Sequence, residues 1–348
     1  MADVIQDSIG HLAEPSLPEA PVVEELRKPW LARLNPAYLV VLLVLLLFPF
    51  ITTGYPLTVL TEILVFGLFA MSLDLILGYT GLPSFGHAAF FGLGAYGTAI
   101  LSAKLGISNL GISLAITIAL TAVGALIIGG LAIRTAGVYF LMVTLAFAQM
   151  IFAAAQKWTW LTGGSNGMPG VRKPTLFVPG IVAADPRAFY LLVLALFAIS
   201  FFILHRLVHS PFGRSLIGIR ENEVRMRAMG YNVKAYKLAA FVIGAVFGGI
   251  AGLTYAYFNN FVSPSDVYWT ASGTVLLMVL IGGAGTLVGP VLGAAFFLLL
   301  QNALSSMTER WPIVLGAVFV IFIMFVRNGL VGVWTNSKFK IQNSKFRG

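Results

Sequence analysis

From about residue 38 to residue 326 the chain alternates long apolar segments with short polar ones. A helix needs about 20 mainly apolar residues to cross a bilayer, and most of these segments approach that length. Because backbone polar groups in lipid must be hydrogen-bonded within the structure, such segments are expected to be helices. The pattern predicts ten of them: 38–52, 57–77, 85–103, 110–133, 137–156, 188–205, 238–258, 271–283, 287–305 and 312–326.

The predicted fold class is therefore all-α, a polytopic transmembrane helical bundle. Three segments, the first, the eighth and the last, are short for a span, and 271–283 is expected either to cross the membrane or to re-enter on the same side. Ten spans divide into two halves of five with opposite orientation, which is compatible with an inverted repeat.

Composition supports the membrane assignment and excludes several classes of function. Hydrophobic residues make up 58% of the chain and charged residues only 10%, whereas a soluble domain carries about 25% charged residues. The net charge of +9 is carried by groups at the ends of apolar segments, which argues against a nucleic-acid partner. With no cysteine there is no disulfide and no thiolate metal site.

The positions of the basic residues predict the orientation. With the amino terminus in the cytoplasm, sixteen of the 22 Lys and Arg fall on cytoplasmic segments, as the positive-inside rule requires. The predicted organisation is a disordered acidic tail over 1–35, a membrane domain over 36–328 and a basic tail over 329–348, with both tails cytoplasmic. Within the membrane domain, loop 206–237 is then cytoplasmic and loop 157–187 external.

Loop 157–187 is rich in glycine and proline, which exclude a long helix. Two interpretations remain equally open: an irregular solvated loop, or a docking surface or outer gate.

A few polar side chains lie at or near membrane depth. A charge inside the bilayer is costly and usually faces a cavity or a partner, so these residues are candidates for a substrate path. For each, local packing or hydrogen bonding is the favoured alternative, and no pair has the spacing of a metal site or a catalytic dyad. The candidates are Glu62, Asp74, Ser84, His87 and Gln149.

The segment 85–103 carries small residues on two helix faces. Gly86, Gly94 and Gly97 share one side, and the other side carries Ala88, Gly92, Ala95 and Ala99. Small residues allow helix backbones to approach closely in lipid. We therefore expect a helix packed inside the bundle.

The cytoplasmic segment 210–230 has the pattern of an amphipathic helix. Ser210 is suited to cap its start and Gly230 to end it. The pairs Glu221–Arg225 and Glu223–Arg227 have the favourable i, i+4 spacing. An apolar stripe needs a cover, either the membrane surface or a groove on a soluble partner, and the segment alone leaves both open. The stripe consists of Phe212, Leu216, Ile219, Met226 and Met229.

Five stretches, in the same order along the chain, resemble a known family. The chain is similar to the permease subunits of branched-chain amino-acid ABC importers, specifically the longer M-type subunit. The stretches are LDLILGYTGLPSFGHAAFFGLGAY, GVYFLMVTLAFAQM, LTGGSNGMPGV, GRSLIGIRENEVRMRAMGYNVKAYKLAAFVIGA and FVSPSDV with LMVLIGGAGTLVGPVLGA.

The resemblance implies a transport subunit of the bacterial inner membrane that works with partners. These are a second, paralogous permease, two cytoplasmic ATPase subunits and a periplasmic solute-binding protein, within membrane lipid. The chain has no phosphate-binding loop, so it is expected not to be an enzyme and to need no cofactor.

The resemblance also identifies 210–230 as the helix that couples to the ATPase. The residues expected at that contact are Leu216, Ile219, Arg220, Glu221, Asn222, Glu223, Met226 and Gly230. The general importer motif places a Glu six residues before its Gly, whereas Glu223 lies seven before Gly230, so Glu223 is not given that motif's role.

Asp74 stands where many members of the family carry Asn, and the urea- and amide-importing members often carry Asp there. A urea or short-amide importer is therefore the alternative within the family. An ion-coupled secondary transporter is a separate alternative, but it explains the amphipathic cytoplasmic segment less well.

Overall fold

A computed structural model describes residues 36–175, 183, 185–325 and 329–332. The chain divides into two compact units, 1–47 and 48–348. Helix α3 (Pro36–Ile51) begins in the first unit and ends in the second. The tail predicted over 1–35 and residues 333–348 of the predicted basic tail lie outside the described residues.

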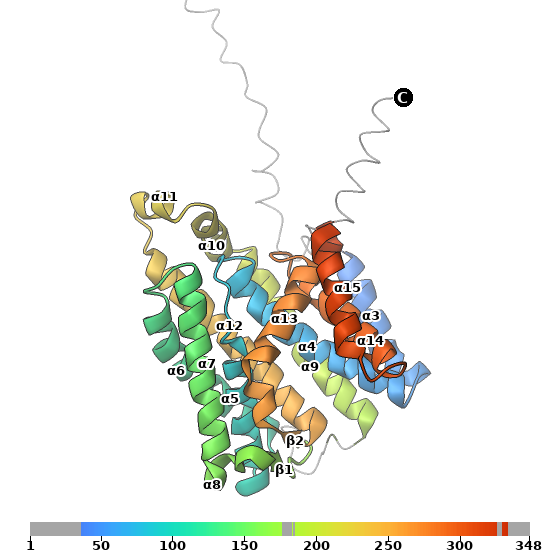
Figure 1. Cartoon of the computed structure of the whole chain (residues 1–348). Helices are drawn as coiled ribbons and strands as arrows, with labels where there is room; N and C mark the ends of the chain where they lie inside the picture. The colour runs from blue at the N-terminus through green and yellow to red at the C-terminus, as the bar shows by residue number, and fades with distance from the viewer. Residues whose placement is uncertain (1–35, 176–182, 184, 326–328, 333–348) are drawn as a thin grey trace, which may run out of the picture. The chain divides into compact units, whose positions relative to one another are not determined.

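The second unit is almost entirely helical, which confirms the predicted fold class (Figure 1). Each of the ten apolar segments forms a helix, with ends within a few residues of those predicted. After α3 the apolar helices are α4 (Tyr55–Leu77), α5 (His87–Ala99, extended by the π-helical turn η2, Ile100–Lys104), α6 (Leu110–Ala132), α7 (Val138–Lys157), α9 (Pro186–Val208), α12 (Val233–Asn259), α13 (Trp269–Gly282), α14 (Val288–Ser305) and α15 (Trp311–Phe325).

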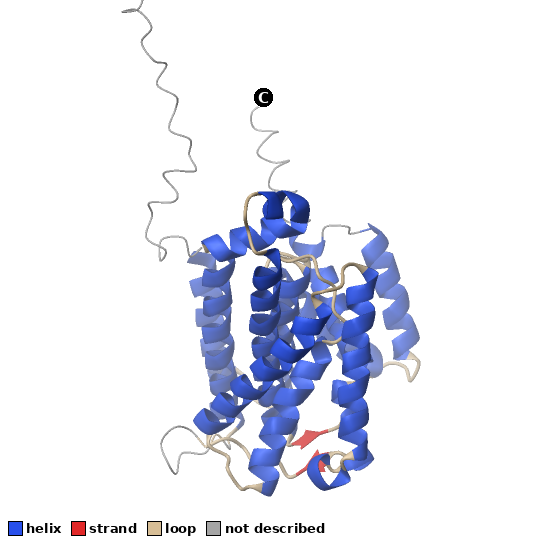
Figure 2. Ribbon diagram, turned by 90° about the vertical axis from the view of Figure 1, so that its left-hand side faces the viewer, coloured by secondary structure: helices blue, strands red, loops and turns tan. Residues whose placement is uncertain are grey.

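The remaining elements are short and lie in the connections. They are α8 (Thr159–Thr162), η3 (Gly164–Asn166), α10 (Pro211–Glu221), α11 (Glu223–Ala228), η4 (Pro264–Val267) and the antiparallel pair β1 (Met168–Pro169) and β2 (Phe261–Val262). Figures 1 and 2 place α10 and α11 at one end of the second unit and the β1–β2 pair at the opposite end. The predicted cytoplasmic and external loops thus lie at opposite ends of this unit.

Six helices of the described chain are long and apolar enough to cross a membrane: α4, α6, α7, α9, α12 and α14. Helix α13 has 14 residues, which at 1.5 Å per residue gives a length of about 21 Å. That is less than the roughly 30 Å of a hydrocarbon core. Its length therefore disfavours α13 as a complete span and fits the re-entrant alternative better.

Helices α4, α5 and α12 form the centre of the second unit. Every residue of α5 except Leu93 is buried, which agrees with the helix that the small residues predicted inside the bundle. Two glycine contacts explain how closely the helices approach: a Cβ on Gly94 would lie 2.0 Å from the Gly249 carbonyl oxygen, and one on Gly252 would lie 1.9 Å from that of Phe91. Only hydrogen fits at these positions, as in other close helix crossings in lipid.

Candidate functional site

Asp74 lies in the last turn of α4 and is completely buried. Its carboxylate accepts hydrogen bonds from the backbone N–H groups of Gly285, at 2.7 Å, and Leu287, at 3.3 Å. These two residues belong to the turn between α13 and α14, so the carboxylate joins the end of one helix to a turn more than 200 residues away. Two charge-assisted bonds to backbone donors offset part of the cost of burying the charge.

The turn from Gly283 to Leu287 needs this support because of its backbone conformation. Gly283 and Gly285 have positive φ angles, and Leu287 has φ of 55° although it is not glycine. With ψ of −44° and a hydrogen bond of 2.6 Å from the Val288 N–H to the Thr286 carbonyl, Leu287 is the central residue of a strained γ-turn, a conformation that costs about 1–3 kcal/mol. The hydrogen bond from the Leu287 N–H to Asp74 helps to hold this residue in place.

Arg220 of α10 binds the same end of α4. Its guanidinium donates a hydrogen bond to the Gly78 carbonyl, and its aliphatic part covers Gly81, where a Cβ would lie 2.8 Å from the Arg220 Cγ. A Cβ on Gly78 would in turn lie 2.1 Å from the Asp74 Oδ1 and 2.2 Å from the Gly285 nitrogen. Arg220, Asp74 and the turn 283–287 therefore meet around one glycine. We call this group of contacts the inner junction.

His87, at the start of α5, is fully buried and bound within the chain. Its Nε2 lies 2.7 Å from the Ser72 Oγ, and its ring stacks on Phe69 with centroids 5.5 Å apart. The Ser72 hydroxyl is also 2.6 Å from the Phe69 carbonyl. The hydroxyl therefore donates to that carbonyl and accepts from the imidazole Nε2–H. These contacts favour a packing role for His87.

The other candidates are placed separately. Ser84 accepts a hydrogen bond from the Gly86 N–H at 3.2 Å, directly before α5. Gln149 is half-buried on α7. Glu62 is twelve residues before Asp74 on α4, a separation of about 18 Å along the helix. The structure thus does not gather the five predicted residues into one site, and their substrate contacts stay a prediction.

The segment 210–230 forms two helices, so a single amphipathic helix is wrong. Asn222 has extended backbone angles between α10 and α11, and its side chain caps α11 by accepting from the Arg225 N–H at 2.9 Å. In the part of the chain that the structure describes, Glu223 pairs with Arg227 at 2.5 Å but no ion pair joins Glu221 to Arg225. The helix is interrupted at Asn222, so Glu221 and Arg225 no longer have the i, i+4 spacing of one continuous helix. Ser210 at the start and Gly230, with φ of 86°, at the end have the expected roles.

The apolar stripe of this segment is largely covered by the chain itself. Leu216, Ile219 and Met226 are 0%, 3% and 7% exposed, and Phe212 stacks on Tyr236 of α12. These side chains hold the two short helices on the membrane domain and are not free for a partner. The exposed apolar side chains are instead Val224 at 77% and Met229 at 57%. Val224 lies off the apolar stripe that an uninterrupted helix would have, so the spacing of apolar residues did not predict its exposure.

Glu223 connects α11 to α12 through Lys237, whose Nζ lies 2.7 Å from the carboxylate. Partial burial raises the pKa of Glu223, but Lys237 and Arg227 outweigh it and bring the pKa below the ordinary 4.5. A carboxyl with a lowered pKa adds stability above its unfolded pKa and loses it as the pH falls through the folded pKa.

Glu223→Gln should therefore lower the midpoint of thermal unfolding by about 1–3 °C at neutral pH, since such partly exposed pairs contribute about 1 kcal/mol or less. Measured in detergent from about pH 7 to about pH 3, the difference from the wild type should shrink on acidification. A difference that grows on acidification would contradict this assignment.

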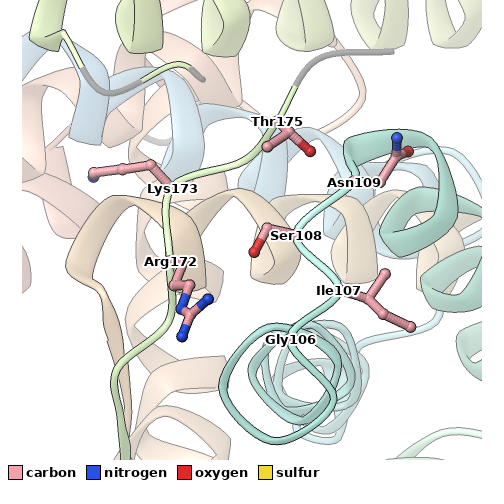
Figure 3. Close-up of a pocket in the computed structure, with 7 residues that line it drawn as sticks. All are labelled: Gly106, Ile107, Ser108, Asn109, Arg172, Lys173 and Thr175. Atoms are coloured by element: carbon pink, nitrogen blue, oxygen red, sulfur yellow. The ribbon is translucent and has the colours of Figure 1, made fainter. Parts of the chain in front are cut away.

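The predicted external loop, 157–187, is anchored to residues at or beside the ends of α5, α6 and α12. The Arg172 N–H donates to the Ser102 Oγ at 2.8 Å, and the Thr175 N–H donates to the Ser108 carbonyl at 2.9 Å. The Lys173 Nζ donates to the Tyr257 carbonyl at 2.7 Å. Beside these contacts lies a cavity of about 450 Å³ lined by residues 106–109, 172, 173 and 175 (Figure 3). The described part of the loop is thus fixed to the bundle, and its role as a docking surface or gate stays a prediction.

The fold is thus that of a polytopic helical membrane protein, with a short helical pair at one end and an anchored loop at the other. Residues 55–326 match the family model described as the branched-chain amino acid transport system permease component. The chain therefore belongs to this family, as the five stretches predicted.

Individual relatives agree with the family match. The LivM permease of the high-affinity branched-chain amino acid transport system of Escherichia coli K12 is 29% identical over 337 residues, covering 89% of this chain and 78% of the relative. The probable LivM permease of Methanocaldococcus jannaschii is 27% identical, covering 73% and 83%. The LivH permease of E. coli K12 is 24% identical, covering 77% and 91%. No solved structure matches.

Proposed function

We propose that this chain is the M-type permease subunit of an ABC importer for branched-chain and other hydrophobic amino acids, and that it forms half of the translocation path. The observation that carries the proposal is the family match over residues 55–326, which includes every helix from α4 to α15. The substrate class follows from the names of the relatives, two of which are LivM proteins.

The proposed assembly contains a second permease, two ATPase subunits and a solute-binding protein. The second permease is a paralogue, a proposal supported by the similarity of this chain to both LivM and LivH proteins. The ATPase is a separate subunit, because the sequence has no phosphate-binding loop. The protein lies in the bacterial inner membrane with both termini in the cytoplasm and binds its solute-binding protein on the outer side.

Transport proceeds by alternating access, in which ATP binding and hydrolysis shift the population between outward-open and inward-open states. Within this chain, α11 receives the movement of the ATPase through its exposed side chains. The inner junction then passes it to the end of α4 and to the turn 283–287, because Arg220 extends from α10 to both. The junction holds the cytoplasmic ends of these segments together in the state described here.

The exposed face of α11 leads to a specific prediction. Val224→Glu should retain the permease pair but lower the recovery of the ATPase subunits at least about tenfold, because a carboxylate in an apolar contact costs more than about 1.4 kcal/mol. Purification in mild detergent, with quantification of each subunit, measures this. Val138→Glu is the matched control: Val138 is also exposed, at 69%, but lies on α7. Equal recovery of the ATPase with both variants would contradict the contact.

Leu216→Glu should behave differently from Val224→Glu. Leu216 is 0% exposed within the chain, so a carboxylate there should reduce the yield of the permease itself.

The proposed function is tested by reconstitution of the complete complex in proteoliposomes. We expect leucine uptake that needs both internal ATP and the binding protein. Uptake of urea in place of leucine would overturn the substrate class, and uptake driven by an ion gradient without ATP would overturn the importer.

A further inference from the structure

The outer half of α4 presents one partly exposed stripe. Thr58, Glu62 and Phe66 are spaced by four residues and share a face, and they are less buried than their neighbours, such as Leu57 and Leu64. In the described part of the chain, Glu62 makes neither a hydrogen bond nor an ion pair with another side chain. An unpaired carboxylate in a membrane span usually faces a cavity or a ligand.

Aromatic rings lie beside this carboxylate. Phe66, one turn from Glu62, contacts Tyr255 of α12 edge to face with centroids 5.9 Å apart, and Phe91 of α5 lies 5.1 Å from the same ring. The Tyr255 hydroxyl donates to the Asp266 carboxylate at 3.1 Å. Both Glu62 and Asp266 act electrostatically on the Tyr255 phenol. Glu62 on the stripe and Asp266 on η4 therefore place two carboxylates near these aromatic rings, a combination that attracts cations.

Tyr96 gives an independent indication of a ligand. It is 7% exposed, and its hydroxyl has no hydrogen-bond partner among the described residues. Gly92, one turn earlier on α5, packs against Val267, so Tyr96 lies on the side that faces η4 and Asp266. A buried polar group without a partner is rare and costly. A ligand group next to Asp266 would supply the missing partner.

Phe66 also lines a mainly apolar cavity. The cavity has a volume of about 420 Å³, within the range typical of small-molecule sites. Leu277 of α13, Phe297 of α14 and Trp311 and Phe319 of α15 line it together with Phe66. Phe66 thus belongs both to the negatively charged aromatic cluster and to the lining of the apolar cavity.

We propose that Glu62, Phe66 and Tyr255 bind the ammonium group of a hydrophobic α-amino acid at the outer end of the translocation path, with its side chain in the apolar cavity. The inference rests on the proposed function for the class of substrate. The Glu62 carboxylate accepts from the ammonium group, the rings of Phe66 and Tyr255 lie against the cation, and the Tyr96 hydroxyl supplies a further hydrogen bond. The cavity favours apolar side chains, because most of its lining residues are apolar and none is charged, with Thr274 and Gln301 the polar residues among them.

The test is saturable binding of labelled leucine to the purified permease–ATPase complex without the solute-binding protein, whose own affinity would mask the site. Two competitors each keep one of the two charged groups of leucine. Isoamylamine has the ammonium group without the carboxylate, and 4-methylpentanoate has the carboxylate without the ammonium group. We expect isoamylamine to displace leucine at concentrations at least tenfold lower than 4-methylpentanoate. If 4-methylpentanoate displaces leucine at lower concentrations than isoamylamine, the proposal is overturned, and this comparison needs only the wild-type complex.

Variants then assign the residues. Glu62→Gln should weaken leucine binding at least tenfold and abolish the preference for isoamylamine, and Glu62→Asp should restore part of both. Glu309→Gln, the same substitution at an exposed external position, is the matched control and should bind like the wild type. Unchanged leucine binding by Glu62→Gln would overturn the assignment.

Two further variants separate binding from a structural role. Tyr96→Phe removes a hydroxyl that has no partner in the described chain, so it should weaken leucine binding several-fold without lowering the unfolding temperature of the free complex. Leu277→Trp, which fills the cavity, should weaken the binding of leucine but leave that of glycine unchanged. A Tyr96→Phe complex that binds normally but unfolds earlier would indicate a structural role.

Failure of this inference is distinguishable from failure of the proposed function. If proteoliposomes with the binding protein import leucine at the expense of ATP but the permease–ATPase complex binds none, the amino-acid site is wrong and the importer stands. If the proteoliposomes import no leucine, the proposed function itself is wrong.

Discussion

Gly252→Ala is expected to prevent the central helices from assembling and to lower the yield of folded protein by about an order of magnitude. The added Cβ would lie 1.9 Å from the Phe91 carbonyl oxygen and 3.1 Å from the Ala95 nitrogen. Both atoms belong to the backbone of α5, so no side-chain rotation relieves the overlap and the helices must separate. Overpacking costs about 1–3 kcal/mol where side chains can adjust, and a displaced backbone at the centre of the bundle costs more.

Gly130→Ala in α6 is the matched control for this substitution. Apart from its chain neighbours and the backbone of α6, no atom lies within 4 Å of the Cβ that it adds, and alanine is favoured over glycine inside a helix by about 0.5–1 kcal/mol. The control should therefore unfold at the same temperature as the wild type or a higher one. The yield of monodisperse protein from size-exclusion chromatography and the unfolding temperature measure both variants. A Gly252→Ala protein with wild-type yield and unfolding temperature would refute the packing of α5 on α12.

The helices were predictable because a single physical requirement, apolar length, determines each one. The small residues of 85–103 also predicted the burial of α5. They did not identify its neighbours, because Gly94 meets the Gly249 carbonyl and Gly92 meets Val267 only after the chain has folded. In a membrane the apolar face of a helix packs equally well against lipid acyl chains or against another helix. Hydropathy therefore does not indicate which helix is the neighbour.

The segment 210–230 was harder to predict. Its apolar spacing was visible, but the break at Asn222 divides it between two helices with different surroundings. Leu216 and Met226 are buried within the chain, whereas Val224 is exposed. Periodicity indicates that a stripe is covered but not whether a partner or the same chain covers it.

Asp74 illustrates the same limit for polar residues. The sequence located it near the inner end of its helix and suggested a local cap or pair. Its partners are instead the backbone donors of Gly285 and Leu287, and the positive φ of a leucine has no signature in the sequence. The glycines at 282, 283 and 285 were the only signal that an unusual turn lies there.

Asp74→Ala is expected to abolish most ATP-dependent uptake, with a loss of at least about tenfold. The substitution leaves the partly buried N–H of Gly285 and the buried N–H of Leu287 without their acceptor, and the loss at a buried group costs about 1–3 kcal/mol. The turn 283–287 then loses its attachment to α4, while α10 and α11 retain their own packing on α12. ATP hydrolysis should therefore continue while uptake falls, which is the signature of an uncoupled transporter.

Asp74→Asn separates the hydrogen bonds from the charge. An amide keeps one acceptor oxygen for Gly285 or Leu287 but turns a donor toward the other, so uptake should lie between that of the wild type and that of Asp74→Ala. Uptake and ATPase activity are measured in the same proteoliposomes, with the exposed Asp185→Ala as the control. If Asp74→Ala reduces ATPase activity and uptake equally, the inner junction is needed for assembly. Within the inner junction, the Asp74 carboxylate is what hydrogen-bonds α4 to the turn 283–287. If Asp74→Ala reduces neither ATPase activity nor uptake, movement of α11 therefore reaches the membrane segments by another route.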